Sequence, residues 1–315
     1  MAETASMTES VSFIVPLFNC LQFSQEMLAS LAATLPPGLS HEIILIDDGS
    51  TDGTREWLGS LSQPQVRVLL NESNLGYAAT NNRAASVASG DLLVLLNDDL
   101  VLSPGWLEPM LALQRGLAKP GAIGNVQLNA STGAVDHAGI YVTCKGKPEH
   151  DVRLARRGEK LHRFSPAVTG ACLMMARRLW LELGGLDASF RNGGEDVDLC
   201  FRALKAGCAN AVALRSVIRH HVSASPGRKD NDERNSYLLT LRWEKELIAW
   251  GARDWCRQHL RRTPYREPLS FPSMLLYLAG LRRNPPSAAR RGVKRAIDHS
   301  LGIWTARFGD LRGST

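Results

Sequence analysis

Residues 42–54 read EIILIDDGSTDGT, a run of aliphatic residues followed at once by acidic, hydroxyl-bearing and glycine residues. The first five have the composition of a strand buried on both faces of a parallel sheet. The rest is typical of a turn that opens a helix, because Asp, Ser, Thr and Gly are favoured in turns and at helix N-caps. A carboxylate at the strand end, Asp47, could equally accept hydrogen bonds from a nucleobase, so both interpretations stay open.

The same alternation of strand and helix patterns runs through the first hundred residues. This alternation predicts right-handed βαβ units and a Rossmann-like open sheet, which binds ligands beyond the carboxyl ends of its strands. Farther along, residues 121–142 favour more strands, 144–163 a charged exposed insertion, and 168–176 a buried strand. The expected strands are 11–18, 42–46, 66–70 and 92–96, and the expected helices are 22–35, one around Trp57 and Leu61, 77–89, a stretch ending at 183, 196–206, and most of the chain after 230.

Length and composition exclude several classes of protein. A chain of 315 residues, 44% hydrophobic and 22% charged, is neither disordered nor collagen-like and can bury a large core. No apolar run approaches the roughly 18 residues that span a bilayer, and the first ten residues lack the apolar stretch of a signal peptide. The six scattered cysteines form no C-x-x-C pair, so we expect reduced thiols and a cytoplasmic protein.

The positive net charge belongs to one end of the chain. Residues 251–315 hold 13 Lys and Arg against 4 Asp and Glu, a balance of +9, which leaves −3 for residues 1–250 out of the total of +6. Basic residues interleaved with apolar helical positions suit an anionic membrane surface, although a solvated helical face explains them equally well. No recognised nucleic-acid module accompanies the charge, so we expect no nucleic-acid partner.

Three further clusters have chemical potential. Asn97, Asp98 and Asp99 follow an apolar strand, and adjacent carboxylates repel each other unless a cation such as Mg²⁺ or Mn²⁺ neutralises them. Residues 193–198, GGEDVD, combine a flexible loop with acidic residues that could cap a helix or supply a general base. His220 and His221 follow an apolar run, and neighbouring residues on an extended chain point to opposite sides, so only one can face a site.

Taken in order, these motifs closely resemble glycosyltransferase family 2, inverting enzymes of the GT-A fold, and its rhamnosyltransferase-like bacterial members. The resemblance covers roughly residues 10–245 and predicts a mostly parallel, Rossmann-like α/β sheet flanked by helices. We therefore expect a catalytic domain over 10–245 and a basic helical extension over 246–315. The motifs that carry the resemblance are PLFN at 16–19, DDGSTDGT at 47–54, NLGY at 74–77 with Asn81 and Asn82, NDD at 97–99, GAC at 170–172, GLD at 185–187, GEDVDL at 194–199, and His220 with Ser223 and Ser225.

The resemblance implies a role for each matching residue. Asn97 replaces the first Asp of the family's D-x-D motif, so Asp99 is the firmer ligand for Mg²⁺ or Mn²⁺, and His220 would complete the coordination. Asp196 matches the catalytic base, with Glu195 beside it. The residues implied in nucleotide-sugar binding are Pro16, Phe18, Asn19, Asp47, Gly76, Asn82, Asn97 and Asp98.

The implied reaction is transfer of a sugar from a nucleoside-diphosphate donor, UDP- or dTDP-linked, to a hydroxyl of a saccharide or lipid-linked acceptor in cell-surface polysaccharide synthesis. Leu239 stands where the Q-x-x-R-W motif of processive members has Gln, so we expect a non-processive enzyme. Two alternatives compete. A sugar nucleotidyltransferase would need a glycine-rich, basic phosphate loop that the first strand lacks, and a silent nucleotide-sugar-binding or scaffold protein would not need Asp47, Asp99, Asp196 and His220 together. The sequence predicts no particular oligomeric state.

Overall fold

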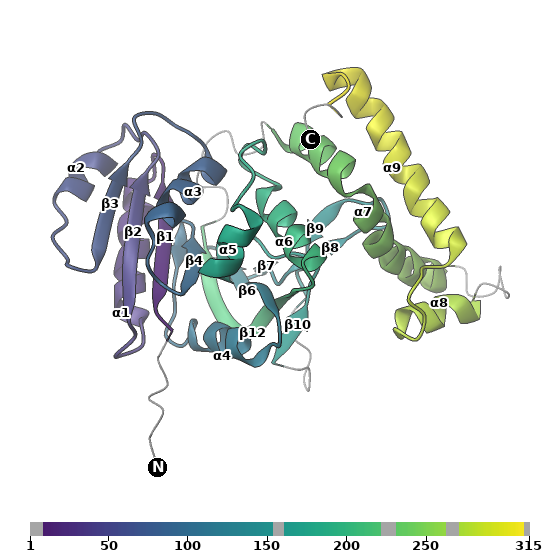
Figure 1. Ribbon diagram of the computed structural model, residues 1–315, viewed down its shortest axis with the longest axis horizontal. Helices are drawn as coiled ribbons and strands as arrows, with labels where there is room; N and C mark the ends of the chain where they lie inside the picture. Colours follow the sequence, from purple (N-terminus) through teal and green to yellow (C-terminus); the bar gives the residue numbers. More distant parts are fainter. Residues whose placement is uncertain (1–8, 154–160, 222–230, 263–270, 312–315) are drawn as a thin grey trace, which may run out of the picture. The chain divides into compact units, whose positions relative to one another are not determined.

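The computed structural model describes residues 9–153, 161–221, 231–262 and 271–311. The chain divides into two compact units (Figure 1). The first comprises Met1–Gly139 and Asp151–Lys229, and the second comprises Ile140–His150 and Asp230–Thr315.

The first half of the first unit alternates strand and helix as predicted. Strands β1 to β4 lie in the order β3-β2-β1-β4 and pair in parallel, so their carboxyl ends meet at one edge of the sheet. Strand β2 is longer than predicted by one residue at each end, which makes Asp47 its last residue. The elements are β1 Val11–Leu17, α1 Leu21–Thr34, β2 His41–Asp47, α2 Thr54–Gly59, β3 Val66–Leu70, α3 Tyr77–Val87 and β4 Leu92–Leu96.

The second half of this unit extends the same sheet. Strand β11 runs antiparallel to β4 and β6, β12 runs parallel to β6, and the described strands together make a ten-stranded sheet. The mostly parallel α/β sheet flanked by helices is thereby confirmed. The added elements are β5 Leu100–Val101, α4 Glu108–Gly116, β6 Pro120–Asn129, β7 Val135–His137, β10 His162–Phe164, β11 Cys172–Ala176, α5 Arg177–Leu183, α6 Glu195–Lys205 and β12 Ala209–His220.

One predicted strand is shorter in the structure. The pattern over 168–176 favours a strand throughout, but β11 begins at Cys172. Residues 168–171 form a buried loop, in which the Gly170 carbonyl accepts a hydrogen bond from the Tyr77 hydroxyl at 2.8 Å. Val168 in this loop is buried by packing against Gly124 of β6 and by a contact with Cys200 of α6 rather than by strand pairing, which composition alone does not distinguish. Part of the predicted exposed insertion, residues 154–160, lies outside the described residues.

Aliphatic strands form the core of the first unit. All five residues of β4, LLVLL, are buried, and β1 and β2 are nearly as apolar, because helices cover both faces of this part of the sheet. Full burial of each such side chain contributes about 1.5–3 kcal/mol to the free energy of unfolding. A rigid apolar sheet therefore fixes the polar residues that follow each strand.

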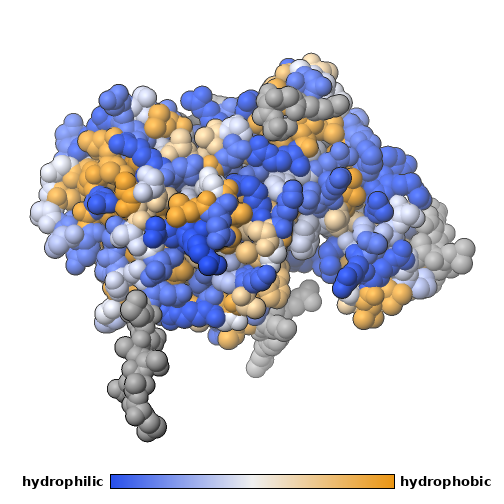
Figure 2. All heavy atoms as spheres, viewed as in Figure 1, coloured by the Kyte–Doolittle hydropathy of each residue, from blue (hydrophilic) through white to orange (hydrophobic). Residues whose placement is uncertain are grey.

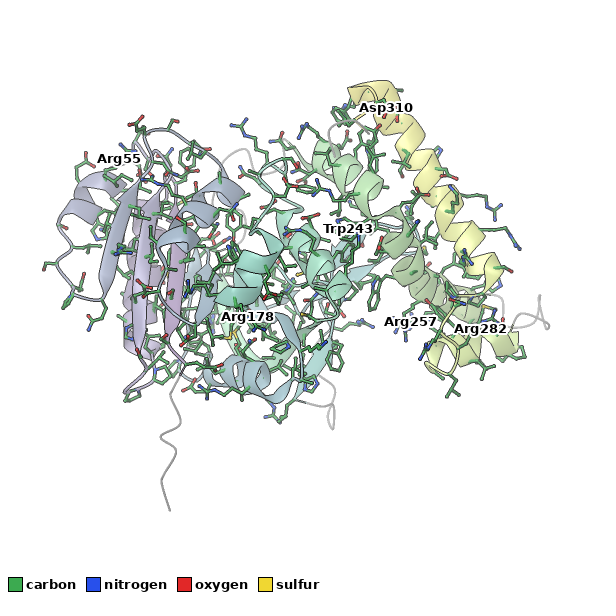
Figure 3. All side chains as sticks on the ribbon, in the orientation of Figure 1. Arg55, Arg178, Trp243, Arg257, Arg282 and Asp310 are labelled. Atoms are coloured by element: carbon green, nitrogen blue, oxygen red, sulfur yellow. The ribbon has the colours of Figure 1, made fainter. Side chains whose placement is uncertain are left out.

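The second unit is helical, as predicted for the region after residue 230, but it also contains a hairpin. The hairpin consists of β8 Ile140–Val142 and β9 Pro148–His150, and the helices are α7 Asp232–Arg262, α8 Phe271–Leu278 and α9 Ser287–Phe308. Helix α7 kinks at the buried Trp243, which has non-helical backbone angles (Figure 3). Within the ranges that the structure describes, no helix combines the length and the apolar character needed to cross a membrane.

Small residues fit the hairpin onto the helices. A Cβ on Gly251 of α7 would lie 2.7 Å from the Thr143 carbonyl oxygen, and Gly146 leaves room for Ile297 of α9. The Cys144 N–H also donates to Asp254 Oδ2 at 2.8 Å. All six cysteines, Cys144 included, are free thiols, which agrees with the absence of a disulfide pattern in the sequence.

Candidate active site

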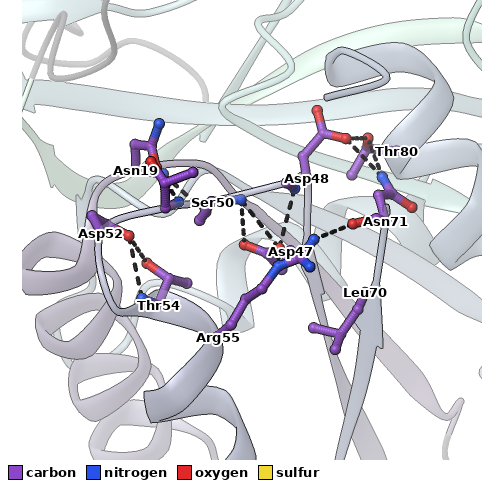
Figure 4. A network of polar contacts seen from close by, with 12 residues as sticks. Asn19, Asp47, Asp48, Ser50, Asp52, Thr54, Arg55, Leu70, Asn71 and Thr80 are labelled. Carbon is purple, nitrogen blue, oxygen red and sulfur yellow. Dashed lines mark hydrogen bonds and ion pairs between the residues drawn. The ribbon is translucent and has the colours of Figure 1, made fainter. Parts of the chain in front are cut away.

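The loop after β2 is closed by its own carboxylates (Figure 4). Asp47 is fully buried, and its oxygens accept hydrogen bonds from the N–H groups of Gly49 and Ser50 and from Arg55 Nε at 2.8 Å. The side chain that we expected to contact a nucleobase therefore already binds the start of α2. Its role toward a base stays a prediction.

Asp48 connects the β2 loop to the segment that leads into α3. Its Oδ1 accepts hydrogen bonds from Asn71 Nδ2 at 2.7 Å, from the Leu75 N–H at 2.9 Å and from the Thr80 hydroxyl at 2.7 Å. Its Oδ2 accepts from the Gly76 N–H at 3.0 Å. One buried carboxylate thus fixes residues 71–80, a role that the sequence did not reveal because a DD pair in a turn looks like local capping.

The end of β1 is bound to the same loop. Asn19 has a left-handed backbone with φ of 52°, which Asn tolerates better than most residues. Its Oδ1 accepts a hydrogen bond from the Thr51 N–H at 2.7 Å, and its own N–H donates to the Ser50 hydroxyl at 3.0 Å. Pro16 lies within β1, and Phe18 follows it half-buried, so these predicted pocket residues border the β2 loop.

The Gly76–Asn82 segment is attached to the loop between α5 and α6. The Asn82 amide donates to the Leu186 carbonyl at 2.7 Å and accepts from the Leu186 N–H at 2.9 Å. Gly185 has room only for a hydrogen, because a Cβ there would lie 2.4 Å from Asn82 Oδ1. Gly76, with φ of 86°, precedes Tyr77, whose N–H donates to Asn192 Oδ1 at 3.2 Å. The polar atoms of Asn82 are thus engaged within the protein, and its contact with a donor stays a prediction.

The NDD cluster after β4 contains two buried carboxylates, Asp98 and Asp99, which have different neighbours. Asp98 Oδ2 lies 3.3 Å from the Ser24 hydroxyl and 3.5 Å from the Phe18 N–H, on the side of α1. Burial, and after it the neighbouring charge of Asp99, raises the pKa of Asp98 to about 7. Asn97 pairs through its N–H with the Ala171 carbonyl at 2.9 Å.

A short antiparallel pairing brings Asp99 to His220. Leu100 of β5 pairs with His220 of β12, and Val101 pairs with Arg219. As a result His220 Nε2 lies 3.2 Å from Asp99 Oδ1, and both side chains are almost fully buried. Asp99 Oδ1 accepts no hydrogen bond from the residues that the structure describes. A buried carboxylate oxygen facing an imidazole nitrogen is a donor set that suits a divalent cation.

Asp136 of β7 lies on the other side of the same imidazole. Its Oδ2 is 3.5 Å from His220 Nδ1, so the histidine is placed between two carboxylates. A carboxylate on the second nitrogen of a ligating histidine fixes the ring's tautomer and orientation. The sequence analysis missed Asp136, because it is a single acidic residue in an irregular segment and only the β6–β7 pairing brings it to this point.

The neighbouring histidine points the opposite way, as expected on an extended chain. The His221 ring lies 4.8 Å from that of Phe23 and its Nε2 is 3.5 Å from Glu26, both on α1. Only His220 faces the acidic cluster. Ser223 and Ser225, which complete the motif in the sequence, lie outside the described residues.

The start of α6 presents the predicted base. Asp196 Oδ2 accepts a hydrogen bond from the Gly170 N–H at 2.9 Å, and its Oδ1 accepts from the Val197 N–H at 2.8 Å. The Asp196 carboxylate is thus held in one orientation while the residue stays partly exposed. Glu195 is buried and accepts from the Gly193 N–H at 2.7 Å, which fits a role in shaping the loop.

These contacts divide the predicted residues into two groups. Asp99 and His220 come together across β5 and β12, and Gly170 lies in contact with both Tyr77 and Asp196. Asp47, Asp98 and Asn82 make contacts that fix the loops around the carboxyl edge of the sheet. The result is a polar edge with one carboxylate–imidazole pair and one separate, oriented carboxylate.

Comparison with known proteins defines the class. The chain has the GT-A fold and aligns over 96% of its length with 59% of the chain of GalNAc-T7, solved with UDP, GalNAc and Mn²⁺, with a TM-score of 0.62 at 18% identity. The profile described as "Glycosyl transferase family 2" matches residues 12–176. The chain belongs to this family, which confirms the resemblance found in the sequence.

Curated relatives include bacterial proteins named for glycan synthesis. The O-antigen biosynthesis protein RfbC of Myxococcus xanthus is 30% identical over 97% of this chain. The N-acetylglucosaminyl-diphospho-decaprenol L-rhamnosyltransferase of Mycobacterium tuberculosis is 26% identical over 88% of this chain and 96% of its own length. The chain spans 23% of the length of the Myxococcus protein and 29% of a Sinorhizobium fredii protein that is 31% identical to it over 85% of this chain.

The Asp48 contacts yield a stability prediction. Asp48→Ala leaves the buried donors of Asn71 and Thr80 without their charged acceptor, so we expect the free energy of unfolding to fall by about 3 kcal/mol in urea denaturation. Glu72→Ala removes an exposed carboxylate from the same segment and should change stability by less than about 0.5 kcal/mol. Equal stability of the two variants would contradict the role given to Asp48.

Proposed function

We propose that this protein is an inverting, metal-dependent, non-processive glycosyltransferase that moves a sugar from a nucleoside-diphosphate donor to an acceptor hydroxyl. The observation that carries the proposal is the buried Asp99–His220 pair at 3.2 Å, on the sheet edge that also bears the oriented Asp196. Membership of glycosyl transferase family 2 supports the reaction class.

The residues present fit a divalent cation shared with the donor. Asp99 Oδ1 and His220 Nε2 would hold it, and a bound Mg²⁺ or Mn²⁺ supplies positive charge to the leaving diphosphate. Among the residues that the structure describes, no group of three or more acidic, histidine or cysteine side chains is arranged to hold a metal. A two-residue site agrees with cations that keep waters and share substrate phosphates. GalNAc-T7, of the same fold, was solved with Mn²⁺ and UDP.

The proposed reaction uses one oriented carboxylate, that of Asp196, as the base. Asp196 would accept the proton of the acceptor hydroxyl as that oxygen attacks the anomeric carbon. The bond from this carbon to the diphosphate oxygen breaks in the same step, and the nucleoside diphosphate leaves from the opposite face, which inverts the configuration. The hydrogen bonds from Gly170 and Val197 hold the Asp196 carboxylate in place and leave its remaining lone pairs for the acceptor.

The donor would bind along the carboxyl edge of β1, β2 and β4. Pro16 lies in β1, and Phe18 and Asn19 follow that strand. Hydrogen bonds to Ser50 and Asp48 fix the segments that contain Asn19 and Gly76. Such preorganisation lowers the entropic cost of binding a nucleotide. We expect a UDP- or dTDP-linked sugar, and the roles of Asp47, Asn82, Asn97 and Asp98 would be to shape this pocket.

The acceptor would be a saccharide or lipid-linked saccharide of a bacterial cell-surface polysaccharide. The names of the Myxococcus and Mycobacterium relatives support this assignment. Leu239, in place of the Gln of processive members, supports transfer of one or a few sugars. We place the protein in the cytoplasm, with its basic second unit in peripheral contact with the membrane.

The base assignment is tested by two isosteric variants. Asp196→Asn keeps the acceptor for the Gly170 N–H but cannot take a proton, so transfer should fall by at least about a thousandfold while donor affinity stays within about twofold. Single-turnover transfer and calorimetric donor binding measure the two effects. If Glu195→Gln loses transfer and Asp196→Asn retains it, the roles of these neighbours are reversed. Undiminished transfer in both variants would contradict the base assignment. No transfer by the wild type with any donor and Mn²⁺ would favour the silent binding protein.

The metal pair is tested by the two neighbouring histidines. His220→Ala should lose most of the gain in nucleoside-diphosphate affinity that Mn²⁺ gives over EDTA, by at least about tenfold in calorimetry. His221→Ala is the matched control, because that ring packs on Phe23 and should leave the Mn²⁺ dependence unchanged. An equal loss in both variants would point to misfolding rather than to a metal ligand.

Asp136 is expected to act through His220 as a positioning residue. Asp136→Asn should weaken the apparent Mn²⁺ affinity by about tenfold, because the imidazole loses the carboxylate beside Nδ1. Maximal transfer should return at saturating Mn²⁺, which a general structural defect would not allow. A lower rate that no Mn²⁺ concentration restores would contradict this role.

A further inference from the structure

Three leucines at the end of α8 form an exposed apolar surface, which we call the α8 knob: Leu275, Leu276 and Leu281. Gly280 has a left-handed backbone with φ of 76°, and its N–H donates to the Tyr277 carbonyl at 3.1 Å. The Leu281 N–H donates to the Leu276 carbonyl at 2.9 Å. This Schellman-type ending folds the chain back, so Leu281 is held beside Leu276 rather than on a free strand.

The knob lies on a helix whose other side is already packed. Met274 and Tyr277 are buried in a core cluster with Ala252 and Cys256 of α7. The Tyr277 hydroxyl also donates to the Ala249 carbonyl at 2.8 Å, which fixes the rotation of α8 about its axis. Leu275, Leu276 and Leu281 are consequently left 45%, 46% and 78% exposed. Figure 2 shows a hydrophobic patch where Figure 1 labels α8, with hydrophilic atoms beside it.

Two arginines follow the α8 knob in the sequence. The Arg282 N–H donates to the same Leu276 carbonyl at 3.1 Å, so the backbone of Arg282 lies next to the α8 knob (Figure 3). Arg282 and Arg283 are both exposed, and neither forms an ion pair with the residues that the structure describes. Residues 271–297 contain six Arg and Lys and no Asp or Glu, and one of these cations, Lys294, pairs with Glu244 at 3.2 Å and with Asp298 at 2.7 Å. A partner that binds this surface must therefore provide both an apolar region and negative charge.

We propose that the α8 knob inserts into the interface of an anionic lipid bilayer, with Arg282 and Arg283 at the headgroups. Leucines beside arginines on one short rigid turn suit the boundary between acyl chains and headgroups. There the burial of apolar surface and the attraction to anionic lipid both contribute to the binding free energy. A second copy of this chain would bring the same cations against each other, which charge repulsion disfavours. The inference rests on the proposed function for its purpose, access to lipid-linked acceptors, but not for the binding itself.

Vesicle sedimentation of the 315-residue chain tests the inference. The probes are vesicles of phosphatidylcholine with about one third phosphatidylglycerol, and vesicles of phosphatidylcholine alone. Leu275→Ser with Leu281→Ser should weaken binding to the anionic vesicles by at least about tenfold, because two inserted side chains are lost. Arg282→Gln with Arg283→Gln should weaken it by about twenty-five-fold, because each cation near the surface contributes about a factor of five. Wild-type binding should also fall with added salt.

Leu181→Ser is the matched control, since it removes a leucine that is 57% exposed on α5 of the first unit. It should bind vesicles as the wild type does. Unchanged binding of the leucine double variant would overturn the inference, and so would a wild-type dimer that the same variant dissociates in sedimentation velocity. Donor hydrolysis with Mn²⁺ is measured in parallel, because its loss would contradict the proposed transfer while leaving vesicle binding as a separate result.

Discussion

The pairing of β5 with β12 is the constraint on which the candidate site depends. Two residue pairs, Leu100 with His220 and Val101 with Arg219, join segments that are far apart in the sequence. Without this pairing, Asp99 would be an isolated carboxylate in the turn after a strand, and His220 would be a buried histidine with no carboxylate of Asp99 beside it. With it, an oxygen and a nitrogen lie 3.2 Å apart in a place that favours positive charge.

The rest of the first unit serves to hold this pair and the donor loops at one edge. Parallel pairing of β1 to β4 places Asn19, Asp47 and Asp99 at carboxyl ends, and the buried aliphatic strands keep those ends fixed. Asp48 then secures the segment leading into α3 through hydrogen bonds to backbone and side chain alike. Burial and the adjacent charge of Asp99 raise the pKa of Asp98, because both disfavour a second anion there. The same two conditions favour binding of a cation at this site.

Much of this arrangement could be predicted from the sequence, because it follows from local patterns. Aliphatic runs ending in acidic turns predicted β2 and β4, and strand alternation predicted that His220 and His221 point apart. The contribution of Asp136 could not be predicted, since it depends on β7 pairing with β6 rather than on any spacing. Strand β8 lies within the stretch 121–142 for which strands were predicted, but its pairing with β9 was missed, because the place of this hairpin beside α7 depends on Gly251 and Gly146, which make no local signal.

A crystal structure of the protein with Mn²⁺ and a nucleoside diphosphate tests the central claim most directly. Anomalous diffraction at the manganese edge locates the ion without reference to the surrounding chain. We expect a single peak within bonding distance of Asp99 and His220 Nε2, with the diphosphate completing the coordination. A peak at any other group of residues, or a nucleotide bound with no ion at this pair, would contradict the account.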